Sequence, residues 1–86
     1  MSNYTDIKNK VLQIIEKYAF DKELVRNALD ESRIIADLKI NSARIVDVIM
    51  DIEDTYQIEI DDASIEKMIR VKDAVDIILG KLNTLK

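Results

Sequence analysis

The 86-residue chain contains no proline and a single glycine, Gly80. These two residue types most often interrupt regular structure or form tight turns, so few points in the chain require a helix or strand to end. Apolar residues recur at helical spacing in several stretches, with a long connection after the first. The sequence therefore predicts an all-α fold, a small four-helix bundle of three main helices and one short helix with a long first loop.

The two most regular stretches each carry one apolar face, as amphipathic helices do. The first predicts a helix over residues 4–19, with Ile7, Val11, Ile14, Ile15 and Tyr18 at helical spacing. The second predicts a helix over residues 42–56, with Ile45, Val48, Ile49, Ile52 and Tyr56 on its apolar face. Asn41 and Ser42 both suit the position that caps the start of this second helix.

The connection over residues 20–41 is too apolar for a solvated linker. We expect it to pack on the core and to contain one helical turn near residues 34–38. A connection of this length without structure of its own is unusual in a compact domain and often has a functional reason. One domain spanning residues 1–86 is expected, because a chain of this length has room for one core.

The C-terminal part predicts a short turn at residues 65–69 and a last helix that starts near residue 71. The apolar stripe of this last helix comprises Val71, Ala74, Val75, Ile78 and Leu82. Before it, Ile58 and Ile60 alternate with charged neighbours. Two isolated alternations without a hairpin partner do not predict a sheet.

The chain contains no cysteine and no histidine. It therefore has no thiolate nucleophile, disulfide, Cys/His zinc site or imidazole acid–base group, and we expect neither catalysis nor a metal site. No apolar run approaches the roughly 18 residues that cross a bilayer, and the first residues lack the apolar core of a signal peptide. We expect a cytoplasmic monomer without a membrane span. The net charge of −4 disfavours binding to nucleic-acid phosphates.

Acidic residues are concentrated in residues 47–66, a segment with no lysine or arginine to neutralise them. Its eight carboxylates belong to Asp47, Asp51, Glu53, Asp54, Glu59, Asp61, Asp62 and Glu66. Such a run is ordinarily a solvated face, but its concentration also fits a basic partner surface. A calcium loop over residues 51–62 is excluded, because its sixth position is Tyr56 instead of glycine and its twelfth is Asp62 instead of glutamate.

Ser42 is a candidate for chemistry at the start of the second helix. With Lys39 as its base it would suit a serine hydrolase, but the two side chains would have to meet in a dry pocket with an oxyanion hole. A bundle this small has little room for such a pocket.

The segment Asp37-Leu38-Lys39-Ile40-Asn41-Ser42 and the acidic helix after it resemble the acyl carrier protein family. In that family a D-S-L motif opens the second helix of a four-helix bundle, and its serine carries 4′-phosphopantetheine through a phosphodiester. The resemblance continues through residues 43–62, 66–67 and 71–78, and covers nearly the whole chain. Asn41 and Ala43 stand where the family usually has Asp and Leu, and Asp61 replaces its usual proline.

The resemblance implies an acyl carrier without catalytic activity, in fatty-acid, polyketide or related lipid synthesis. Ser42 would be the attachment residue for 4′-phosphopantetheine, at a helix start where unpaired N–H groups and the helix dipole favour an anion. Two alternatives stay open. In the first, Ser42 is only a capping residue. In the second, the chain is an unmodified carrier-like module that acts through its acidic second helix.

The partners implied are a holo-acyl-carrier-protein synthase or another phosphopantetheinyl transferase, and acyl-transfer and condensing enzymes with basic docking surfaces. We expect them to contact Asn41, Ala43, Val46, Asp47, Met50, Asp51, Glu53 and Asp54. Val46 and Met50 lie outside the core face of the second helix, and an apolar anchor within a charged rim is typical of a docking surface. The alternative is that these two side chains pack under the long loop. The resemblance also suggests that acyl chains enter between the helices.

Overall fold

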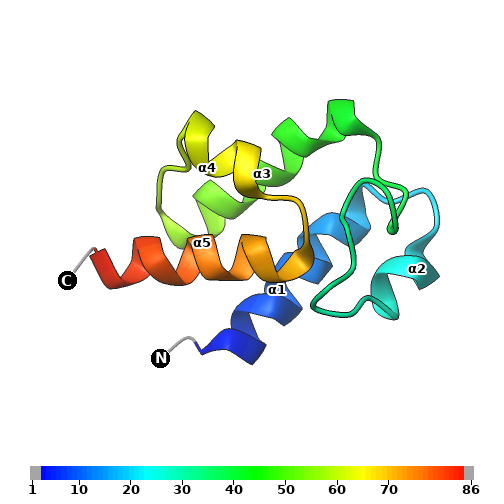
Figure 1. The fold of residues 1–86 in the computed structure, drawn as a ribbon, viewed down its shortest axis with the longest axis horizontal. Helices are drawn as coiled ribbons and strands as arrows, with labels where there is room; N and C mark the ends of the chain where they lie inside the picture. The colour runs from blue at the N-terminus through cyan, green and yellow to red at the C-terminus, as the bar shows by residue number, and fades with distance from the viewer. Residues whose placement is uncertain (1–2, 85–86) are drawn as a thin grey trace.

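The computed structural model describes residues 3–84 and has five α-helices and one short 3₁₀ turn in that range (Figure 1). In chain order these are α1 (Tyr4–Lys17), α2 (Lys22–Arg26), η1 (Ser42–Arg44), α3 (Ile45–Tyr56), α4 (Asp62–Lys67) and α5 (Val71–Thr84). The all-α bundle predicted from the sequence is confirmed. The three main helices are α1, α3 and α5, and two short helices accompany them.

The first helix is capped at its start and ends two residues before the predicted limit. The side chain of Asn3 accepts a hydrogen bond of 2.9 Å from the backbone N–H of Asp6, which satisfies one of the free donors of the first turn. At the other end the chain leaves α1 at Tyr18. The side chain of Asp21 then accepts from the N–H groups of Glu23 and Leu24 and starts α2.

Helix α2 corrects the expectation of a connection with a single helical turn. It has five residues, of which only Val25 is buried, so it shows no apolar periodicity in the sequence. The expected turn near residues 34–38 is present as well. The N–H groups of Asp37 and Leu38 both donate to the carbonyl of Arg33, at 2.9 and 3.0 Å.

Helix α4 begins earlier than the predicted turn at residues 65–69. Asp61 accepts a 2.8 Å hydrogen bond from the N–H of Ser64, so the helix starts at Asp62 and ends at Lys67. Ile58 and Ile60 are buried in the connection before it and belong to no strand, as expected. They anchor this connection to the core.

The core combines side chains from α1, α3 and α5 with those of the connections. Its buried members include Ile7, Val11, Ile14 and Ile15 of α1, Val48, Ile49 and Ile52 of α3, and Val71, Ala74, Val75 and Ile78 of α5. Four residues that the apolar stripes placed on core faces are only partly buried at its edge: Tyr18, Ile45, Tyr56 and Leu82. Ile34, Leu38 and Ile40 of the long loop are buried too, which confirms that this loop packs on the core.

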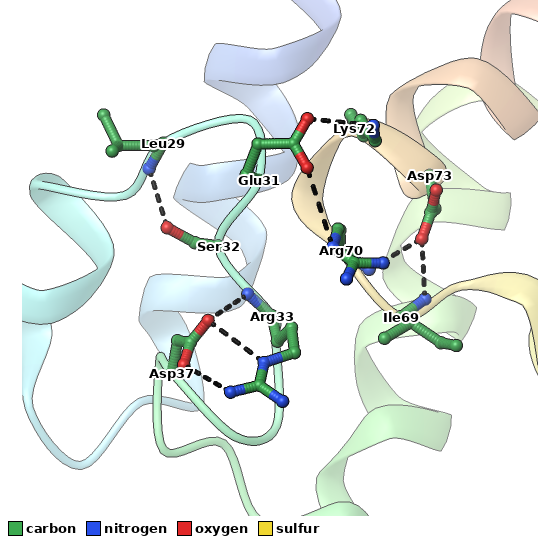
Figure 2. A network of polar contacts seen from close by, with 9 residues as sticks. All are labelled: Leu29, Glu31, Ser32, Arg33, Asp37, Ile69, Arg70, Lys72 and Asp73. Atoms are coloured by element: carbon green, nitrogen blue, oxygen red, sulfur yellow. Dashed lines mark hydrogen bonds and ion pairs between the residues drawn. The ribbon is translucent and has the colours of Figure 1, made fainter.

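Backbone hydrogen bonds attach the long loop to the start of α5. The N–H of Ile34 donates to the carbonyl of Ile69 at 2.9 Å, and the N–H of Val71 donates to the carbonyl of Ser32 at 3.0 Å. Side chains support this junction, as Figure 2 shows: Glu31 pairs with Lys72 at 2.8 Å, and its other oxygen lies 3.7 Å from Arg70.

Each of the two segments that meet at this junction also has a carboxylate that accepts backbone N–H groups (Figure 2). Asp73 accepts from the N–H groups of Ile69 and Arg70, and Asp37 accepts from the N–H and guanidinium of Arg33. The loop is therefore attached to the start of α5 by both backbone and side-chain contacts.

Candidate functional site

The candidate attachment residue, Ser42, is exposed on η1 at the point where the chain enters α3. Asn41 caps this turn: its side-chain oxygen accepts from the N–H of Ala43 at 2.9 Å, and its carbonyl accepts from the N–H of Arg44 at 2.8 Å. Within residues 3–84 the hydroxyl of Ser42 makes no hydrogen bond. The suggestion that Ser42 serves only as a cap is therefore wrong, because Asn41 fills that position.

The backbone donors at this helix start are mostly occupied. The N–H groups of Ala43, Arg44 and Ile45 already donate to oxygens of Asn41 and Ser42. An anion attached to Ser42 would therefore be favoured mainly by the helix dipole. Fewer unpaired N–H groups would face it than the sequence suggested.

An apolar hollow of about 460 Å³ opens beside Ser42. One wall is Ile35 and Ala36 of the long loop, and the other is formed by Ile65, Met68 and Ile69 around α4. Ser42 and Ile45 line it from the start of η1 and α3. Two charged residues, Arg33 and Glu66, complete the lining of this apolar hollow.

Lys39 does not lie on this side of Ser42. It adopts a left-handed backbone conformation with φ of 59° and lines a different hollow, together with Asn41 and Arg44. The structure therefore does not bring Lys39 and Ser42 together as base and nucleophile. Within residues 3–84 the acidic side chains also form no cluster of the kind that holds a metal ion.

The outward face of α3 carries the predicted apolar stripe. Val46 is 62% exposed and Met50 is 56% exposed, and Ala43 is exposed on the turn before them. The alternative that Val46 and Met50 pack under the long loop is wrong. Asp54 continues the face as an exposed carboxylate, whereas Asp47, Asp51 and Glu53 are only partly exposed.

Several carboxylates of residues 47–66 have partners in the folded chain. Asp47 pairs with Arg44 at 3.1 Å, and Asp51 pairs with Lys17 of α1 at 2.7 Å. Glu53 instead accepts the backbone N–H of Ile60 at 2.8 Å. The segment contains no basic residue, and Lys17 and Arg44 from outside it neutralise two of its carboxylates.

Asp51 contacts two side chains at the end of α1. Its Oδ2 atom accepts from the hydroxyl of Tyr18 at 2.8 Å in addition to the ion pair with Lys17. These hydrogen bonds, first that of Lys17 and then that of Tyr18, lower the pKa of Asp51, and each raises the pKa of its donor. This cluster could not be predicted from local sequence patterns, because Tyr18 and Asp51 are 33 residues apart. The Arg44–Asp47 pair, by contrast, has the i, i+3 spacing that helices allow.

A helical bundle that presents an exposed serine at the start of an acidic helix has the form of a carrier domain. Comparison with known proteins agrees. The chain is 36% identical to an acyl carrier protein of Campylobacter jejuni over 91% of its own length and 94% of the relative. It is 37% identical to an acyl carrier protein of Thermotoga maritima, over 95% and 99% of the two chains.

A solved structure supports the same assignment. The structure of the acyl carrier protein from Enterococcus faecalis superposes with a TM-score of 0.75 at 26% identity, covering 93% of this chain and 99% of the other. No family model matches the sequence. On these relatives the chain belongs to the acyl carrier protein family, whose members are carriers and not enzymes. Among the described residues, none of the helices has the length and apolar character needed to cross a membrane.

Proposed function

We propose that this chain carries acyl groups on a 4′-phosphopantetheine arm attached to Ser42 through a phosphodiester. The observation that carries the proposal is the exposed hydroxyl of Ser42, which Asn41 leaves unengaged by capping the turn itself. The family membership supports it, since acyl carrier proteins use this prosthetic group in general. The arm supplies a thiol that the sequence lacks, and acyl groups bound to it as thioesters can reach successive enzymes.

The residues around Ser42 fit such an arm. Asn41 caps the turn, and Ser42 beside it is exposed, so a transferase can reach this residue. Ile35, Ile45 and Ile69 line the apolar hollow beside Ser42 and offer apolar surface to the arm or its cargo. Burial of apolar cargo there would be favourable in proportion to the area removed from water.

The partners of this function are a phosphopantetheinyl transferase, such as a holo-acyl-carrier-protein synthase, and the acyl-transfer and condensing enzymes that take the cargo. Their basic surfaces would meet the carboxylates of α3 around Val46 and Met50, of which Asp54 is the exposed one. Charge complementarity of this kind mainly accelerates the encounter, which suits a carrier that exchanges partners quickly. The alternative of an unmodified interaction module is not favoured by relatives that are named acyl carrier proteins.

Intact mass spectrometry tests the proposal. The purified chain, incubated with coenzyme A and phosphopantetheinyl transferases, should gain the mass of one phosphopantetheine. Ser42→Ala should abolish the gain, and Ser64→Ala, which removes a hydroxyl on α4, should not. A Ser42→Ala chain that is still modified would place the attachment elsewhere.

A further inference from the structure

A second hollow, of about 570 Å³, lies beside Asn41 and is lined by three basic side chains. Its lining contains Lys17, Lys39 and Arg44 and no carboxylate. These cations come from the end of α1, from the loop before η1 and from η1 itself. We refer to it as the cationic hollow. It contrasts with the net charge of the chain, which is −4.

Phe20 also lines the cationic hollow and is 98% exposed. It lies in the turn between α1 and α2, away from the buried core. Aromatic side chains and arginine are enriched in protein–protein interfaces, where aromatic residues often serve as anchors. An exposed phenylalanine among three cations therefore has the composition of a contact surface.

The three cations differ in how far the chain already neutralises them. Lys17 pairs with Asp51 and Arg44 pairs with Asp47, both on the acidic side of α3. Lys39 has no carboxylate within ion-pair distance in the part of the chain that the structure describes. Its charge is therefore the one most available to a partner.

We propose that the cationic hollow receives a carboxylate-bearing segment of the transferase that modifies Ser42, with Phe20 as the apolar anchor of this contact. The inference rests on the proposed function. Asn41 and Arg44 lie one and two residues from Ser42, so an enzyme that reaches this hydroxyl also covers the edge of the hollow. A partner surface that is basic throughout would be repelled there, and one with carboxylates opposite Lys39 would be attracted.

The direction in which a charge reversal at Lys39 changes the KM for the carrier tests the inference. With the transferase that loads the wild-type chain in its native host, and with coenzyme A, we expect Lys39→Glu to raise the KM for the carrier about 3- to 10-fold at low salt and to leave kcat unchanged. A uniformly basic partner would gain from the added carboxylate, so its KM would fall. Lys10→Glu, which makes the same charge change at an exposed position of α1 outside the hollow, should have little effect.

Phe20→Ala gives an independent readout. Because the ring is almost fully exposed, the helical circular dichroism and the thermal midpoint should not change, while the KM should rise. A KM for Lys39→Glu at or below the wild-type value, or equal effects of Lys39→Glu and Lys10→Glu, would overturn this inference and leave the proposed function intact. A wild-type chain that no transferase loads would overturn both.

Discussion

The hydroxyl of Tyr18, just after α1, donates a 2.8 Å hydrogen bond to the carboxylate of Asp51 in the middle of α3. The same oxygen lies 2.7 Å from Nζ of Lys17. This cluster links the first helix to the acidic helix at the edge of the core. Asp51 therefore has a structural role in addition to any contact with partners.

The cluster should make stability depend on pH at the acidic end. Because the folded-state pKa of Asp51 is lowered, the contribution of Asp51 is complete above the unfolded pKa of about 3.9 and is lost as the pH falls through the lower, folded value. Asp51→Asn should thus lower the urea midpoint at pH 7, and the difference from wild type should shrink towards pH 3. Asp54→Asn, at an exposed carboxylate, is the control. A deficit that stays constant from pH 7 to pH 3 would contradict this role.

The buried and exposed faces of α3 should respond differently to truncation. Ile52 is fully buried, so Ile52→Ala should lower the free energy of unfolding by about 2–5 kcal/mol through lost burial and a residual cavity. Met50→Ala removes an exposed side chain and should change the free energy of unfolding by no more than about 0.5 kcal/mol. Urea titration at pH 7 measures both. Comparable losses would show that Met50 is packed in solution.

Charged and apolar side chains of α3 should affect different rate constants of docking. Asp54 is exposed, so Asp54→Lys should slow association with a condensing enzyme, and the effect should weaken with added salt. Met50→Ala should mainly speed dissociation with little change in salt dependence. Stopped-flow fluorescence with one cognate enzyme distinguishes the two. Unchanged rate constants in both variants would place the docking surface elsewhere.

Asn41 allows charge and capping to be tested separately. Asn41→Asp retains a side-chain oxygen for the N–H of Ala43, so the turn should be preserved, and loading should be faster if the transferase recognises a negative charge here. Asn41→Ala loses the cap and should cost about 0.5–2 kcal/mol of stability. Initial loading rates by mass spectrometry, with urea titration of both variants, give the comparison. Equal rates for Asn41→Asp and wild type would show that a negative charge at this position does not affect modification.

The sequence predicted those parts of the fold in which burial is periodic. α1 and α5 each bury four side chains at helical spacing, and their positions followed directly. α2 was missed because only Val25 marks it, and α4 was placed too late because its start depends on the Asp61 cap. A cap of that kind leaves no apolar pattern.

The site was only partly predictable for a related reason. Ser42 and the outward stripe of Val46 and Met50 lie in one continuous segment, so their spacing could be read directly. The pairing of Lys17 with Asp51, and the placement of Phe20 and Lys39 in the lining of one hollow, bring together residues that are distant in the sequence. Such contacts depend on how the helices pack, which local periodicity does not specify.

The hydrogen bond from the N–H of Ile34 to the carbonyl of Ile69 spans the two walls of the apolar hollow beside Ser42. Ile35, which follows the donor residue, and Ile69, the acceptor residue, both line the hollow. Moving these two residues apart would therefore lengthen a backbone hydrogen bond. The width of the hollow that is available to cargo is thus coupled to the protection of one amide, that of Ile34, from exchange with solvent. The hydrogen-exchange rate of the Ile34 amide should therefore differ between the empty and the filled hollow.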